Sequence, residues 1–571
     1  MSKFEKILSV FLFVLLVSVV AGRFSGLYSR NTEDAYSEVR QNIYIFGQLY
    51  KEVANRYVEA VDPEKFMRAG IQGMLDQLDP YTVYLEPDGR DELQIMTRGK
   101  YYGVGMRITT RNGWPTVAEQ PFPNSPAALT GIREGDQIIK IDGRTTQDDN
   151  LSETAKRLRD TKKGSEVTIE IRRVGEDKPL EFTLVRDEIV VPDIEYTGFV
   201  EPGIGVIKLS RFNRGAGEQI QDALEDLLNR GMKALIFDLR QDPGGLLDVA
   251  VSVADNFLPR GELIVYTEGR WEKTKQEYRA QTNPIIGNMP MVVLVDGLSA
   301  SASEIVAGAI QDLDRGVIIG SRTFGKGLVQ TVLPLDRRGE HQLKMTTAQY
   351  YIPSGRLIQR PEVFNRGANS VLIESEAEQD SVQNNEEQTF YTKNGRPVKG
   401  GGGINPDIVV ENRRVNRYFI ELIRRSMFFN FSLDYLSTHP DIAEDFQVDE
   451  EIMDLFFDFV KAKEFDYEPE GYDELNELER IAEENGFDDP IAQAIDSIRR
   501  EFDNVKEKER LASLDFIKSR LQRELAAKAF GSAVAIETTF KSDSAVVKAV
   551  EVLKDQEKYG KILNSSLALR E

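Results

Sequence analysis

A cluster of small residues between two apolar runs is the feature that most restricts how this chain folds. The cluster extends from Ser299 to Glu304 (SASASE), after a strand-like run at 291–295 and at the start of a helical run at 302–310. A serine at such a strand–turn–helix junction is presented above the edge of a sheet, where an activated nucleophile belongs. The alternative interpretation is a capping box, in which Ser301 caps the helix and Glu304 completes the cap.

A single lysine between glycines follows, far enough along the chain to cross a helix and a strand and return beside the serine. A serine hydroxyl is a poor nucleophile until a base removes its proton. A lysine can be that base only if burial and the lack of an acidic partner lower its pKa. Lys326, in the run FGKGLVQ that ends at Gln330, has an apolar, glycine-rich setting. The pattern predicts Ser301 as nucleophile, Lys326 as general base and Gln330 as its orienting residue, whereas Lys326 alone would indicate a surface turn.

Composition removes several classes of protein. Lys and Arg number 72 against 94 Asp and Glu, and the formal net charge of −22 argues against a nucleic-acid partner. The absence of cysteine excludes disulfides, cysteine proteases and a lipidated cysteine. The two histidines, His341 and His439, are far from the serine cluster, which argues against a Ser-His-Asp triad and against a His-rich zinc site. We expect no metal and no cofactor.

A phosphate-binding loop is a competing hypothesis for the lysine. Residues 320–326 (GSRTFGK) satisfy most of the P-loop pattern, and a strand precedes them. However, Gly327 occupies the position where serine or threonine should bind magnesium, and residues 328–333 have the pattern of a strand instead of the required helix. We therefore do not expect nucleotide binding.

A glycine-rich turn completes the expected site. Residues 238–246 (DLRQDPGGL) lie between a strand-like and a helical run. Proline followed by two glycines leaves free backbone N–H groups at a helix start, which suits an oxyanion hole, and the N–H of Ala302 is a second candidate donor. The alternative is an ordinary β–α turn.

A separate β-rich region precedes this core. It contains a glycine-spaced loop at 102–106 (YGVGM), the string GIREGDQI at 131–138, a helical run at 151–159 and alternating apolar residues at 167, 169 and 171. This order resembles a PDZ domain. Glycines in the loop let backbone N–H groups point into one pocket, which can hold a terminal carboxylate while the peptide adds a strand to the sheet. The expected pocket residues are Gly103, Val104, Gly105 and Met106; the alternative is a β-domain with a tight turn and no ligand.

The N-terminus carries a targeting pattern. Lys3 and Lys6 precede a fifteen-residue apolar run from Ile7 to Ala21, which suits a signal-peptide core better than a membrane span of about 20 residues. An uncleaved anchor and a buried helix are the alternatives. We expect an exported, periplasmic chain, soluble or held at the inner membrane by this segment.

The domain organisation follows from the changing patterns. We expect a signal peptide or anchor at 1–22, helices at 32–95, a PDZ domain at 99–187, an α/β core at 188–410 and a helical C-terminal domain at 414–571. A polar, acidic stretch at about 370–400 is expected to be a flexible insertion in the core. The fold class is therefore α/β multidomain, with a helical lead-in, a PDZ domain before the layered core and a helical extension.

Together these motifs resemble the carboxy-terminal processing proteases, also called tail-specific proteases. The strings GMLDQLDP at 73–80, YYIPSGR at 350–356 and GINPD at 403–407 also match that family, and the resemblance covers about Asp34 to Val410. One departure is Asp242, where the family usually has asparagine; an acid there can shift the pH dependence.

The resemblance implies an exported serine endopeptidase that recognises C-terminal tails of proteins through its PDZ domain and cleaves them with a Ser–Lys dyad. Its partners would be polypeptides with apolar C-termini, and Gly245 and Ala302 would form the oxyanion hole. The helices after Arg413 lie outside the resemblance; such an acidic tail can dimerise, contact an adaptor or cover the site. Two rival hypotheses are a peptide-binding scaffold with an inert site and a non-proteolytic serine hydrolase.

Overall fold

The computed structural model describes residues 37–147, 149–160, 162–270, 275–360, 388–411, 415–486 and 489–564. The expected signal segment and most of the expected insertion lie outside these residues. The described residues divide into two compact units, those up to residue 84 and those from residue 85 onward. Among the described residues, no helix combines the length and the apolar character that a membrane span requires.

The first unit is mainly helical, as its sequence predicted, but the short strand β1 (Val83–Leu85) interrupts the helices expected at 32–95. A helix at 37–56 precedes α2 (Pro63–Leu75). Asp62 caps α2 by accepting the backbone N–H groups of the two residues after Pro63, which itself occupies the first turn. The hydroxyl of Tyr50 donates to the carbonyl of Pro63 at 2.7 Å, and its ring stacks on Phe66.

The second unit begins with a small β-domain around a strongly apolar core. Its main sheet has the order β3-β4-β5-β7-β8, with β6 beside β5, and β2 pairs with β9. Ile138, Ile169, Ile171 and Leu184 are completely buried in it. The elements are α3 (Pro87–Arg98), β2 (Lys100–Gly103), β3 (Ile108–Arg111), β4 (Trp114–Val117), α4 (Pro126–Leu129), β5 (Gln137–Ile141), β6 (Arg144–Thr145), α5 (Leu151–Leu158), β7 (Glu166–Arg172), β8 (Leu180–Val185) and β9 (Asp187–Val190).

A largely parallel sheet of order β10-β11-β12-β15-β16-β21 forms the centre of the α/β core. Only β10 is antiparallel to its neighbour. The carboxyl ends of the parallel strands share one edge, so the turns after β12, β15 and β16 meet there. The elements are β10 (Ile194–Glu201), β11 (Ile204–Leu209), α6 (Ala216–Asn229), β12 (Ala234–Asp238), α7 (Leu247–Asp255), β15 (Met291–Val295), α8 (Ala302–Asp312), β16 (Val317–Gly320) and β21 (Ile408–Val409).

The turn after β16 leads into a second sheet. In it, β18 pairs with β13 and β17, and β13 pairs with β14. The segment directly after Lys326 is a strand, as predicted, so the helix that a P-loop requires is absent from these described residues. The elements are β13 (Leu263–Gly269), β14 (Gln276–Arg279), β17 (Leu328–Pro334), β18 (Gln342–Tyr351) and the hairpin β19 (Thr389–Tyr391) and β20 (Pro397–Lys399), which occupies the end of the expected insertion.

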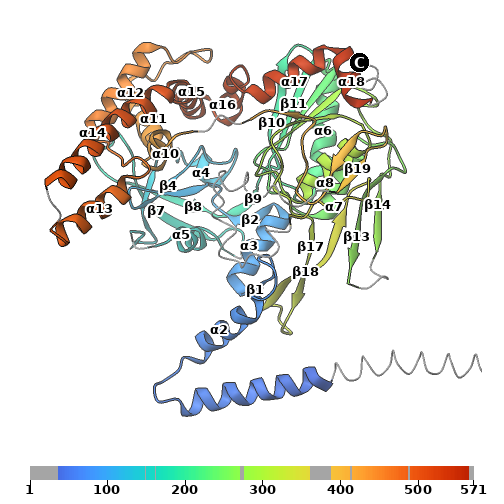
Figure 1. Ribbon diagram of the computed structural model, residues 1–571, viewed down its shortest axis with the longest axis horizontal. Helices are drawn as coiled ribbons and strands as arrows, with labels where there is room; N and C mark the ends of the chain where they lie inside the picture. Colours follow the sequence, from blue (N-terminus) through green and yellow to red (C-terminus); the bar gives the residue numbers. More distant parts are fainter. Residues whose placement is uncertain are drawn as a thin grey trace, which may run out of the picture. The chain divides into compact units, whose positions relative to one another are not determined.

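The C-terminal helices complete the core. Side chains of α6, α7 and α8 bury one face of the parallel sheet, including Phe237 and Val293. The opposite face, with Ile236 and Val292, is buried by α16, α17 and α18 (Figure 1). The helices are α10 (Arg417–Arg424), α11 (Met427–Thr438), α12 (Glu450–Ala462), α13 (Tyr472–Glu484), α14 (Asp489–Ala512), α15 (Leu514–Phe530), α16 (Ser532–Thr539), α17 (Ser544–Lys554) and α18 (Gln556–Leu563).

The same helices also hold the β-domain. Lys528 of α15 is 3% exposed and forms ion pairs with Glu134 of the β-domain at 2.9 Å and with Glu524 at 2.7 Å. Its ammonium group lies over the ring of Phe429, as does the guanidinium of Arg111. A buried ionic contact of this kind links the β-domain to α11 and α15.

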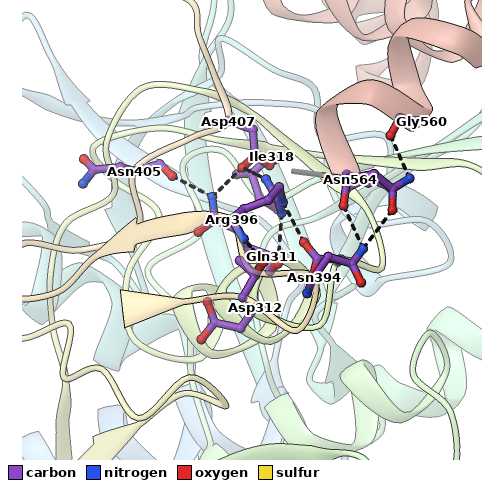
Figure 2. Close-up of polar contacts among 12 residues, drawn as sticks. Gln311, Asp312, Ile318, Asn394, Arg396, Asn405, Asp407, Gly560 and Asn564 are labelled. Carbon is purple, nitrogen blue, oxygen red and sulfur yellow. Dashed lines mark hydrogen bonds and ion pairs between the residues drawn. The ribbon is translucent and has the colours of Figure 1, made fainter. Parts of the chain in front are cut away.

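A polar network fastens the end of α18 to the far end of α8. Asn394, between β19 and β20, donates to the carbonyl of Leu563 at 2.7 Å. Arg396 pairs with Asp407 at 2.6 Å and donates to the carbonyl of Gln311 at 3.1 Å, while the Gln311 amide donates to Asp407 at 3.0 Å (Figure 2). The network therefore ties the hairpin, α8 and the C-terminal helices together.

Candidate active site

The turn after β15 carries Ser301 in a strained backbone conformation. Its φ of 57° and ψ of −112° lie in a region that side chains other than glycine rarely adopt, and α8 begins at the next residue. The turn is fixed from below by Ser299, whose hydroxyl donates to the carbonyl of Leu239 at 2.8 Å, and by Asp296, which accepts the N–H of Ser299. These hydrogen bonds hold Ser301 in its strained conformation at the carboxyl end of the sheet.

Glu304 joins the Ser301 turn to the lysine loop. Its Oε2 accepts the backbone N–H groups of Ser301 at 2.8 Å and Lys326 at 2.9 Å. Its Oε1 accepts the Thr323 hydroxyl at 2.6 Å and the N–H of Gly325 at 2.7 Å. The side chain is completely buried, and burial raises the pKa of Glu304 to about 7 despite these donors. Glu304 does form the glutamate half of the capping box, but it also positions a second loop.

Lys326 lies partly buried near the end of the loop before β17. Its ammonium nitrogen is 3.4 Å from Oε1 of Gln330, the residue predicted to orient it. The hydroxyl of Tyr350, on the neighbouring strand β18, lies within hydrogen-bonding distance of the main-chain carbonyls of Ser301 (3.1 Å) and Lys326. Glu304 and Tyr350 thus bridge the backbones of the two residues predicted to form the dyad.

The glycine turn after β12 faces the Ser301 turn. A Cβ atom on Gly244 would lie 2.4 Å from the carbonyl oxygen of Ala300 and 2.7 Å from the nitrogen of Ala302, so only glycine fits there. The N–H of Gly244 donates to the Asp242 side chain at 2.8 Å. Within the described residues, the N–H groups of Gly245 and Ala302 donate no hydrogen bond, so both predicted oxyanion donors are available.

A cavity of about 400 Å³ lies beside this arrangement. It is lined by residues of β17 and β18 on one side and of α7, β13 and β14 on the other, among them Leu247, Tyr278, Val329 and Ala348. One lining residue, Val329, belongs to β17, the strand that follows the lysine loop.

A second cavity lies beside the glycine-spaced loop of the β-domain; of the four predicted pocket residues, Val104 and Met106 line it, whereas Gly103 and Gly105 do not. This cavity of about 500 Å³ is lined by Val104, Met106 and Ile108 on one side and by Ala155 and Leu158 of α5 on the other. Within the described part of the chain, the N–H groups of residues 104–106 donate no hydrogen bond. A carboxylate placed at this loop would find several free donors.

The sequence-based prediction overlooked three positioning side chains. It recognised Glu304 only as a helix cap, quoted Tyr350 only as part of a motif and gave Thr323 no role. The signal for Glu304 was its place in the serine cluster, but its second partner is more than twenty residues away. No local pattern reveals such a contact.

Comparison with protein families matches four segments of the chain. Peptidase family S41 matches residues 203–365, a PDZ domain matches 117–173, the activating protease CtpB N-terminal domain matches 24–89 and a C-terminal helical domain of PDZ-proteases matches 418–553. These matches agree with the expected fold class, including the helical lead-in and the helical extension.

Curated relatives point in the same direction. The chain is 38% identical over 338 residues to a carboxy-terminal-processing protease of Bartonella bacilliformis, covering 58% of this chain and 75% of the relative. It is 29% identical over 361 residues to the carboxy-terminal processing protease CtpA of Bacillus subtilis, covering 62% and 75%. A carboxyl-terminal-processing protease of Synechocystis is 39% identical over 291 residues, covering 50% of this chain and 66% of the relative.

Proposed function

The chain belongs to the carboxy-terminal-processing proteases of peptidase family S41, and we propose that it cleaves exported polypeptides with a Ser301–Lys326 dyad after capturing their C-termini in the PDZ domain. The main evidence for the dyad is that two side chains each connect the backbone of Ser301 to the backbone of Lys326. Glu304 accepts the N–H of both residues, and Tyr350 reaches the carbonyl of both. Such a bridge fixes the separation of nucleophile and base.

In the proposed mechanism, the neutral amine of Lys326 removes the proton from the Ser301 hydroxyl as its oxygen attacks the scissile carbonyl. The negative oxygen of the tetrahedral intermediate accepts the free N–H groups of Gly245 and Ala302. The lysine then gives its proton to the departing amine, which leaves an acyl ester on Ser301. A water molecule, deprotonated by the same lysine, hydrolyses that ester and releases the new C-terminus.

Gln330 is well suited to keep the lysine neutral. An amide oxygen accepts a hydrogen bond from the amine without adding the negative charge that would stabilise the ammonium form. The Lys326 nitrogen lies 3.4 Å from this oxygen, which is long for a hydrogen bond and therefore a weak hold on the amine.

Tail recognition is supported by the loop at 104–106 and the apolar groove beside it. The free N–H groups suit a terminal carboxylate, and the lining of Val104, Met106 and Ile108 suits apolar side chains. Export is supported by the apolar run at residues 7–21 after two lysines.

The first test is digestion of an unstructured protein with an apolar C-terminus, followed by mass spectrometry. Wild-type protein is expected to cut it and Ser301→Ala to leave it intact. Lys326→Ala should reduce kcat by about 10²- to 10⁴-fold. Full activity in Lys326→Ala would overturn the dyad, and cleavage by neither protein would favour a binding scaffold.

A second arm tests the PDZ pocket. The same substrate with an amidated C-terminus should be cut with a higher KM and a similar kcat for the bound chain, because amidation removes the charge that the loop receives. Equal kcat/KM for the free and amidated tails would refute carboxylate capture.

A further inference from the structure

The glycine turn contains a buried acid with one unused oxygen. Oδ1 of Asp242 accepts the N–H of Gly244 at 2.8 Å, whereas Oδ2 is buried and has no hydrogen-bond partner among the described residues. The side chain as a whole is 0% exposed. Both oxygens of a buried carboxylate normally accept hydrogen bonds. An environment that leaves one oxygen without a donor suits a neutral carboxyl group better than a charged one.

Asp242 also connects the glycine turn to the nucleophile turn. Its main-chain carbonyl accepts the N–H of Ala300 at 3.1 Å and the hydroxyl of Ser303 at 2.9 Å. One residue therefore sets the position of Gly244 through its side chain and the residues on either side of Ser301 through its backbone.

The bond to Gly244 decides which donor is left for the oxyanion. Because the N–H of Gly244 is occupied by Asp242, the N–H of Gly245 is the free donor of the pair, opposite that of Ala302. Weakening the bond between Asp242 and Gly244 would allow the turn to rotate and would misplace the Gly245 N–H.

We propose that Asp242 is a positioning residue of the oxyanion hole and that the hole is competent only while this carboxyl group is protonated. The inference rests on the proposed function. An ionised Asp242 would place a full negative charge next to Gly244, in the same turn as the Gly245 donor, while the tetrahedral intermediate develops negative charge of its own. Since like charges repel strongly in a site that excludes water, ionisation opposes the transition state.

The surrounding charges agree with this proposal. Burial raises the pKa of Asp242 to about 8 although the N–H of Gly244 and the hydroxyl of Ser303 lower it; the nearby charge of Asp193 raises it and that of Arg211 lowers it. Burial also raises the pKa of Asp193, to about 6, and its carboxylate accepts hydrogen bonds from the side-chain amides of Asn213 and Gln219. On the other side of the turn, Asp296 accepts the N–H of Gln241 at 3.0 Å. Beyond Ser301, the buried Glu304 completes the set of acids around the site.

The expected consequence is an alkaline limit on catalysis. A dyad with a lysine base predicts by itself an activity that rises with pH to a plateau. Ionisation of Asp242 would instead lower kcat/KM by roughly tenfold for each pH unit above about 8.

The experiment is a pH profile of kcat/KM for a quenched fluorescent peptide, from about pH 6 to about pH 10. Asp242→Asn, which keeps the shape and cannot ionise, should lose the alkaline limb, so that its kcat/KM no longer falls above about pH 8 whatever its level at neutral pH. If the substitution acted only by disturbing the structure, it would lower kcat/KM by the same factor at every pH and leave the shape of the profile unchanged.

Asp193→Asn is the second variant. Removing the charge of Asp193 should lower the pKa of Asp242 and move the alkaline limb to lower pH. This variant decides the matter even if Asp242→Asn does not fold. An alkaline limb that is absent from the wild type, or that neither substitution moves, would overturn the proposal.

The outcome is separable from that of the proposed function. If the wild type shows no turnover beyond that of Ser301→Ala, the protease mechanism fails. If turnover depends on Ser301 but the limb is insensitive to Asp242 and Asp193, only the role of Asp242 fails.

Discussion

The carboxyl group of Glu304 accepts the backbone N–H of Lys326 at 2.9 Å, although a helix and a strand separate the two residues in the chain. The same oxygen accepts the N–H of Ser301. We expect Glu304→Ala to lower kcat by about 10²-fold with a smaller change in KM, because the two turns lose their common acceptor and their relative position.

Glu304→Gln is the informative companion to that variant. Each oxygen of Glu304 accepts two donors, so the amide nitrogen of glutamine would face two N–H or O–H groups that need an acceptor. Steady-state kinetics should therefore show a loss in the glutamine variant too. Wild-type kcat in both variants would contradict a positioning role.

Gly244 is predicted to be irreplaceable at the oxyanion turn. Its φ of +89° and the 2.4 Å approach of the Ala300 carbonyl to an added Cβ mean that Gly244→Ala must shift the Ser301 turn. Gly215→Ala is the matched control, because its φ of +96° is similar and nothing lies within 4 Å. The control should lose about 1 to 2 kcal/mol of stability with unchanged kcat, whereas Gly244→Ala should lose most activity.

Asp242 should make the stability of the folded protein fall as pH rises. Its pKa of about 8 exceeds the ordinary value of 3.8, so the folded state holds a proton that the unfolded chain releases. That contribution is complete below about pH 4 and is lost progressively up to about pH 8. The free energy of unfolding, measured in urea, should fall with pH for the wild type and not for Asp242→Asn. The variant should therefore become the more stable protein by up to about 5 kcal/mol over this range. A difference that stays constant with pH would show that Asp242 is ionised throughout.

Lys528 is predicted to hold the β-domain against the C-terminal helices. Lys528→Met would leave Glu134 buried without its ion-pair partner and would leave Glu524 with Arg520 alone, at a cost of about 3 to 5 kcal/mol. Lys518→Met, on the exposed side of the same helix, is the control and should be neutral. Hydrogen exchange at residues 131–136 measures the effect directly, and equal protection in both variants would rule out this contact as a clamp.

Two adjacent valines of α17 test whether this helix stabilises the sheet that it covers. Val546 is 1% exposed and packs in the cluster with Ile236 and Val292, whereas Val547 is 49% exposed. Val546→Asp should destabilise the protein by about 3 to 5 kcal/mol and lower its melting temperature, while Val547→Asp should change stability by less than about 0.5 kcal/mol. Similar melting temperatures would mean that α17 is dispensable for the protease core.

Local patterns in the sequence were sufficient to predict the main elements. Apolar runs at 234–238 and 291–295, each followed by small or glycine-rich residues and a helical run, indicated the parallel strands and the turns that carry Gly245 and Ser301. The string at 131–138 likewise indicated the β-domain. Periodicity and turn chemistry are local properties, so a single sequence carries them.

Contacts between distant segments were decided only by the tertiary structure. The sequence predicted Glu304 as a helix cap, and packing of parallel strands brought the loop at 323–326 onto its free oxygen. It predicted helices after residue 414 but left their role open, and burial against Ile236 and Val292 made α16–α18 part of the core. The physical reason is the same in both cases: the sequence specifies which groups need a partner, and the spatial arrangement of the strands and helices determines which partner they find.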